Sequence, residues 1–173
     1  MKMFRLAASA AMIVSVVAGV IAPVSAQSTR QFVNREKREW IPWSVAAGRP
    51  NINFNRAVGI YVWHDGNRVH ILSADQSRGG QAIHGQIHLR GVGSIYDVDR
   101  QHLEGKDKVG RKGDTIGFRL DTYNATDGFT FSIKGGEALA IDIDQRGRSD
   151  RNVYLGRSQV AANAGVVVLD LRR

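Results

Sequence analysis

The sequence predicts an all-β protein: a single antiparallel β-sandwich or jelly-roll-like domain that follows a cleaved signal peptide. Short runs with period-two alternation recur along the chain, and glycine-containing turns separate them with no helical period between them. The chain has no cysteine, so its stability must come from a hydrophobic core. A chain of ~150 residues can supply one, since it buries about 68–70% of its unfolded surface. A barrel is the competing architecture.

The first residues have the pattern of a secretory leader. Lys2 and Arg5 precede a small and apolar run over residues 6–22, and Val24-Ser25-Ala26 then supplies the small residues of a cleavage site. The run is shorter than the ~20 residues of a membrane span, and no later segment repeats it. We therefore expect an extracytoplasmic protein, periplasmic or secreted, with no transmembrane segment. Its parts are a signal peptide (1–26), an irregular lead-in segment (27–55) and a β-sandwich domain (56–173).

The chain is basic, with a formal net charge of +8. A basic exported protein is attracted to polyanions, so an anionic polysaccharide or another cell-envelope component is the expected partner. Acidic and basic residues are mixed rather than segregated, as in residues 35–39, and form no stripe of the kind that binds nucleic acid. We therefore expect no specific nucleic-acid partner. Nothing in the pattern predicts the oligomeric state.

The clearest hairpin joins two β-rich runs, residues 59–64 and 67–72, through Asp65-Gly66. Side chains alternate along a strand, so each run has two faces. One face is apolar and predicts core: Ile60, Val62, Val69 and Ile71. The other predicts a ligand-binding surface: Tyr61, Trp63, Arg68 and His70.

This second face is the candidate site. Aromatic rings stack on sugar rings, and a guanidinium beside them pairs with a carboxylate, sulfate or phosphate. We expect Trp63 and Arg68 to lie opposite each other as an exposed pair across the turn. The alternative is structural, with the aromatic rings lying under a loop and Arg68 extending its stem across them.

Further strands are predicted on both sides of a charged loop. Residues 83–90, 115–122, 129–133 and 139–143 all alternate, which places Phe118, Phe131 and Ile141 inward. The glycine-rich segment 104–114 is expected to be a flexible surface loop or a contact loop. In all we expect eight or nine strands and no helix. In the lead-in, Trp40 and Trp43 are expected to cap one end of the core, with an exposed aromatic edge as the alternative.

No motif predicts a metal, a cofactor or a catalytic centre. His84 and His88 are four residues apart on a strand, about 13 Å, too far to share one zinc ion. The segment 142–150 resembles a calcium loop, but Arg146 and Arg148 stand where ligands are needed. There is no Gly-x-Ser-x-Gly elbow. We expect a non-enzymatic binding protein. The alternatives are a secreted glycan-active hydrolase, using carboxylates such as Glu104, Asp107 and Asp121, and a structural envelope protein.

Four segments resemble a group of uncharacterised secreted bacterial proteins with no established activity. They are residues 59–66, residues 84–87, the turn and strand at 127–131, and Leu155-Gly156-Arg157. The basic stretch from Lys106 to Lys112 departs from that pattern. The resemblance implies export and a single β domain, and it implies no site residue.

Overall fold

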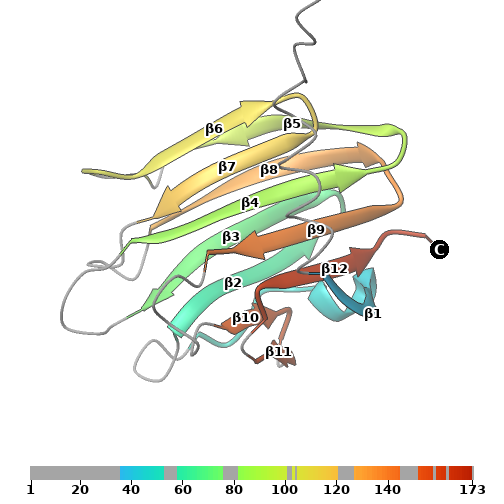
Figure 1. Cartoon of the computed structure of the whole chain (residues 1–173), viewed down its shortest axis with the longest axis horizontal. Helices are drawn as coiled ribbons and strands as arrows, with labels where there is room; N and C mark the ends of the chain where they lie inside the picture. The colour runs from blue at the N-terminus through green and yellow to red at the C-terminus, as the bar shows by residue number, and fades with distance from the viewer. Residues whose placement is uncertain are drawn as a thin grey trace, which may run out of the picture.

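The computed structural model describes residues 36–52, 58–75, 82–100, 103, 105–120, 127–144, 152–157, 159–162 and 164–172. These residues form twelve strands and one short 3-10 helix (Figure 1). In chain order the elements are β1 (Glu36–Pro42), η1 (Trp43–Ala46), β2 (Val58–Asp65), β3 (Arg68–Asp75), β4 (Ile83–Arg90), β5 (Gly93–Asp99), β6 (Lys108–Lys112), β7 (Thr115–Leu120), β8 (Gly128–Gly135), β9 (Ala138–Ile143), β10 (Asn152–Leu155), β11 (Gln159–Ala161) and β12 (Val166–Asp170). The predicted all-β class is confirmed. The predicted signal peptide lies outside the described residues.

The strands form two six-stranded sheets. Sheet A has the order β1-β12-β9-β4-β7-β6, and sheet B has the order β11-β10-β2-β3-β8-β5. Most neighbours are antiparallel, but β1 runs parallel to β12 and β10 runs parallel to β2. The prediction of a purely antiparallel arrangement is therefore wrong. Both parallel pairs join strands far apart in the chain, where no short turn dictates direction.

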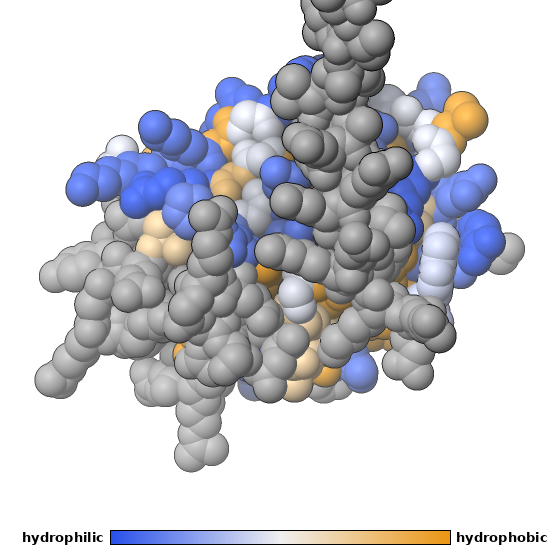
Figure 2. Space-filling view, in the orientation of Figure 1, coloured by the Kyte–Doolittle hydropathy of each residue, from blue (hydrophilic) through white to orange (hydrophobic). Residues whose placement is uncertain are grey.

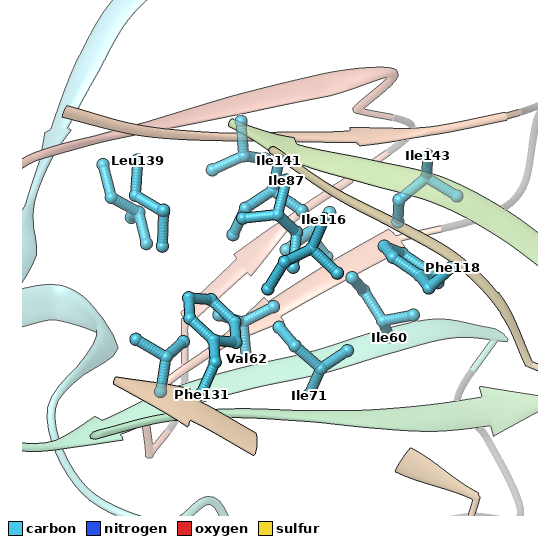
Figure 3. Close-up of a cluster of buried hydrophobic side chains, with 14 of the residues drawn as sticks. Ile60, Val62, Ile71, Ile87, Ile116, Phe118, Phe131, Leu139, Ile141 and Ile143 are labelled. Atoms are coloured by element: carbon cyan, nitrogen blue, oxygen red, sulfur yellow. The ribbon is translucent and has the colours of Figure 1, made fainter. Parts of the chain in front are cut away.

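One hydrophobic cluster receives side chains from both sheets (Figure 3). Sheet B contributes residues such as Ile60, Val62 and Phe131, and sheet A contributes residues such as Phe118 and Ile141. Each of these is at most 5% exposed, so the inward faces predicted from alternation are confirmed. Burying one such side chain contributes about 1.5–3 kcal/mol, and the cluster holds the two sheets together.

The hairpin of β2 and β3 turns one residue later than predicted. Asp65 pairs with Arg68, which leaves Gly66 and Asn67 as the two-residue loop. Gly66 has φ +58°, the positive value that a type II′ turn requires at its first position. The two predicted faces survive, because the new pairing keeps every residue on its side of the sheet. The cross-strand partners change: Trp63 lies opposite His70 rather than opposite Arg68.

Two segments expected to lack regular structure contain strands at the edges of sheet A. β1 pairs with β12 inside the predicted lead-in, so the described β fold begins before residue 56. β6 pairs with β7 inside the predicted charged loop. Both sequences are rich in charge, which hides a strand pattern. Edge strands tolerate such residues, and lysines there protect the unpaired edge.

The two tryptophans near the start of the described chain have different environments. Trp43 is half-buried and packs against the core cluster, as expected of a residue that caps one end of it. Trp40 is 40% exposed. It pairs with Val168 on the outer face of sheet A. Of the two expectations for this tryptophan, its position agrees with the exposed aromatic edge and not with a cap on the core.

Candidate functional site

A cavity of about 830 Å³ lies on the outer side of sheet B, against the segment that follows η1. That volume is within the range of sites that hold small molecules. β2, β3, β8 and residues 48–52 contribute its walls. Its lining residues are Gly48, Arg49, Ile52, Trp63, Asp65, His70, Ile71, Leu72, Gly128, Phe129 and Thr130. Two of the four predicted site residues, Trp63 and His70, are among them.

Trp63 and His70 lie in the wall of this cavity as a stacked pair of rings. They are cross-strand partners on β2 and β3. Their rings stack with centroids 4.9 Å apart and planes 6° apart. Both residues are half-buried. The stack holds both rings in place within the cavity wall, and an aromatic ring is a surface on which a sugar ring can pack.

His70 is held in its uncharged form at neutral pH. Its pKa lies below the ordinary value of 6.5, first because burial disfavours the charged ring and then because Arg68 is nearby. Asp65 opposes this shift and Arg49 adds to it. A neutral imidazole offers one hydrogen-bond donor and one acceptor. His70 therefore supplies polar specificity to the wall without charge.

Arg68 is not available to a ligand in the way that the sequence suggested. Its guanidinium forms an ion pair with Asp97 and donates to Thr130 Oγ1 at 2.6 Å, and Asp99 Oδ2 lies 3.6 Å away. It is absent from the cavity lining. Asp97 has φ +52° and lies where the pairing of β5 with β8 shifts register. This irregularity, which alternation does not reveal, brings the two carboxylates to Arg68.

Tyr61 supports the site from beneath. It is 4% exposed and packs in a small cluster with Ile52, Trp63, Leu72 and Tyr154. Its ring centroid lies 4.7 Å from that of Tyr154. The prediction of Tyr61 as an exposed contact residue is therefore wrong. A second aromatic layer from β10 covers this part of the face, and strand pairing between distant segments creates that layer.

Arginines near the cavity were missed by the sequence analysis. Arg49 is exposed and lines the cavity. The Arg157 guanidinium lies close to Gly48, with Nε 2.9 Å from where a Cβ on that glycine would be. A side chain at position 48 would therefore displace Arg157. At this end of the cavity, the sequence pattern indicated only the turn at Asp65. It did not indicate Arg49 or Arg157, because both reach the site through long-range contacts.

A second, smaller cavity of about 480 Å³ lies across the end of β2. The Trp43 ring stacks on the His64 ring with centroids 4.0 Å apart. The Arg172 guanidinium lies 4.7 Å from the centre of the Trp40 ring. The remaining lining residues are Pro42, Ser44, Ala47, Asp170 and Leu171.

Charge distinguishes this second cavity from the first. Its guanidinium is neutralised, because Arg172 Nε donates to Asp170 Oδ1 at 2.9 Å and Nη2 donates to Oδ2 at 3.0 Å. The same hydrogen bonds lower the pKa of Asp170. Gly48 N donates to His64 O at 3.0 Å, so the segment around residues 47 and 48 separates the two cavities. The first cavity is therefore the better candidate for an anionic ligand.

Among the described residues that line the first cavity, Asp65 is the one carboxylate. Glu104 and Asp121, two of the carboxylates named for a hydrolase, lie outside the described residues. Within those residues, no group of three or more His, Asp or Glu side chains could hold a metal ion. In the same part of the chain, no helix has the length and apolar character that crossing a bilayer requires.

Comparisons with protein-family models, with curated proteins and with solved structures found no match. The resemblance to uncharacterised secreted bacterial proteins therefore stays a prediction.

Proposed function

We propose that the protein is an exported β-sandwich that binds, without catalysis, an acidic sugar unit of an anionic glycan or other envelope component. The cavity beside Trp63 and His70 is the proposed binding site. The observation that carries the proposal is the stacked pair of Trp63 and His70 in a cavity that is also lined by the exposed Arg49.

Each part of the cavity suits one part of such a ligand. The apolar face of a sugar ring packs on the Trp63 indole, and aromatic packing of this kind contributes about 0.5–1.5 kcal/mol beyond the area buried. Arg49 pairs with the carboxylate, since a guanidinium offers two parallel donors to it. Asp65 and Thr130 are placed to accept and donate hydrogen bonds to sugar hydroxyls.

The ligand is proposed to be acidic because the charged groups around the cavity are unequal. Arg49 lines it and Arg157 lies beside Gly48, whereas Asp65 is the single acidic residue in the described part of the lining. Arg68 does not add to this balance, because Asp97 neutralises it. A hydrolase would need a second carboxylate at working distance from Asp65, and the described residues of the cavity lining include none.

Titration calorimetry with short uronic-acid oligomers tests the proposal. Trp63→Ala and Arg49→Ala are each expected to weaken binding about tenfold or more, a loss of about 1.4 kcal/mol. Neutral oligomers of equal length should bind the unaltered protein more weakly than uronate oligomers. Arg49 is exposed, so its replacement should leave the melting temperature nearly unchanged.

Matched controls are available on sheet B and just beyond it. Tyr96 is an exposed aromatic residue on β5, and Arg100 is an exposed arginine that follows it. Tyr96→Ala and Arg100→Ala should leave the affinity for the uronate oligomers within about twofold. If Arg49→Ala and Trp63→Ala behave like these controls, the cavity is not the acidic-sugar site.

A further inference from the structure

The outer face of sheet A carries a second charged surface, on the opposite side of the core from the cavity of sheet B. Strand register aligns the outward residues of β6, β7 and β4 in three rows. The first row is Lys108, Arg119 and His84; the second is Gly110, Gly117 and Gln86; the third is Lys112, Thr115 and His88. We call these nine residues the β6–β7–β4 face.

The middle row is low and open on β6 and β7, where it consists of two glycines, and Gln86 ends it on β4. Gly110 and Gly117 are both exposed, and a Cβ built on either would meet no atom within 4 Å. The outer rows lie two residues away along each strand on either side, which is about 7 Å. The middle row is therefore the floor of a shallow trough, and the outer rows are its walls.

Positive charge lies on both walls. Lys108 and Lys112 are exposed, and neither forms an ion pair with any other residue that the structure describes. The Arg119 guanidinium donates to the carbonyl of Lys106, which holds it near β6. Two carboxylates border the face: that of Asp114 approaches the His88 ring at 3.5 Å, and Asp142 on β9 lies opposite Gln86 in the register. Figure 2 shows hydrophilic side chains gathered at the left of the view, where Figure 1 shows β6.

We propose that the β6–β7–β4 face binds an extended chain of an acidic polysaccharide, which lies across the three strands along the glycine floor. Lys108 and Lys112 pair with acidic groups on the two sides of the chain. The bare floor at Gly117 lets the chain approach the backbone. This surface is independent of the sheet B cavity, and it selects for a line of charges rather than for one acidic sugar.

The composition of the face favours a polysaccharide over a single-stranded nucleic acid. Proteins that bind single strands without sequence preference stack the bases on aromatic side chains. None of the nine residues of the face is Phe, Tyr or Trp. The alternative explanation for the lysines of β6 is that they protect an edge strand. That role does not require open glycines between two rows that carry positive charge.

Retention on immobilised heparin tests the charge requirement. The double variant Lys108→Glu and Lys112→Glu should elute at a much lower salt concentration than the unaltered protein. The control is Lys134→Glu with Arg100→Glu, which changes the net charge equally at exposed positions near sheet B. Charge at the β6 edge is kept in the first variant, so its solubility should be kept too. Equal losses from the two double variants would overturn the proposal.

A steric variant tests the trough itself. Gly117→Val fills the floor without altering charge, and a Cβ at this position would meet no atom within 4 Å. Its affinity for a heparin oligosaccharide should fall at least about threefold, whereas unchanged affinity would show that the chain does not lie there. Tighter binding of a single-stranded DNA of equal charge would overturn the polysaccharide assignment. Both variants should retain the calorimetric affinity for uronate oligomers in the sheet B cavity, which separates this proposal from the preceding one.

Discussion

At the scale of single residues, the four side chains of the predicted binding face have three different roles. Trp63 and His70 form the cavity wall, Tyr61 is buried beneath them, and Arg68 is neutralised by Asp97. All four lie on the face of β2 and β3 that the alternation of the sequence predicted. Their roles depend on neighbours from β5, β8 and β10, which alternation within one hairpin does not reveal.

The lowered pKa of His70 predicts a pH dependence of stability. Burial and Arg68 place its folded pKa below the ordinary value of 6.5, so protons bind more readily to the unfolded chain. The contribution of His70 to the free energy of unfolding is therefore complete above about pH 6.5, and it is lost as the pH falls through the pKa of His70 in the folded protein. Replacing His70 with Gln removes this titration.

Urea denaturation at about pH 7.5 and about pH 5 measures the effect. Between these two values the unaltered protein should lose more unfolding free energy than His70→Gln. Substitution of the exposed His84 by Gln is the control and should leave the wild-type pH dependence nearly unaltered. An identical pH dependence in His70→Gln would show that His70 is not the group responsible.

At the scale of secondary-structure elements, the parallel pairing of β10 with β2 depends on one glycine. Gly59 has φ +135°, and a Cβ there would lie 1.8 Å from the backbone oxygen of Asn152, its partner in the register. Neither the backbone angle nor the contact tolerates a side chain. β10 in turn carries Tyr154, which packs on Tyr61 below the cavity.

We therefore predict that Gly59→Ala destabilises the protein by about 2–5 kcal/mol, since strain and overpacking each cost about 1–3 kcal/mol. The matched control is Gly110→Ala on β6, where the added methyl group meets nothing within 4 Å. That change should alter stability by no more than about 1 kcal/mol. Equal stabilities of the two variants in denaturant titration would contradict the role assigned to Gly59.

At the scale of the whole molecule, the two proposed binding surfaces lie on opposite sides of one core. The cluster between the sheets joins them, since side chains from sheet A and sheet B are almost fully buried in it. The protein can function outside the cytoplasm only if its leader is recognised. We therefore also propose, for the molecule as a whole, that it is exported.

Mass spectrometry of the exported protein tests the leader. Cleavage after Val24-Ser25-Ala26 should leave Gln27 as the first residue. Loss of Lys2 and Arg5 with the leader should lower the positive charge without altering either proposed surface. An exported protein that retains residues 1–26 would contradict the cleavage, and a protein that stays in the cytoplasm would contradict the export.

The sequence by itself determined the β class and the inward face of the strands around Ile60, Phe118, Phe131 and Ile141. Alternation has a period of two, so it reports directly which side chains share a face. It also brought Trp63 and His70 into the candidate site, because both lie on one hairpin.

Only the tertiary structure decided which strands are neighbours, which pairs are parallel, and which charges meet. Arg49 reaches the cavity from the segment after η1, Asp97 reaches Arg68 from β5, and the glycines of the trough align through the pairing of β6, β7 and β4. Strand partners are chosen by packing and hydrogen bonding between distant segments. The alternation of one strand is the same whichever partner it has, and therefore carries no record of that choice.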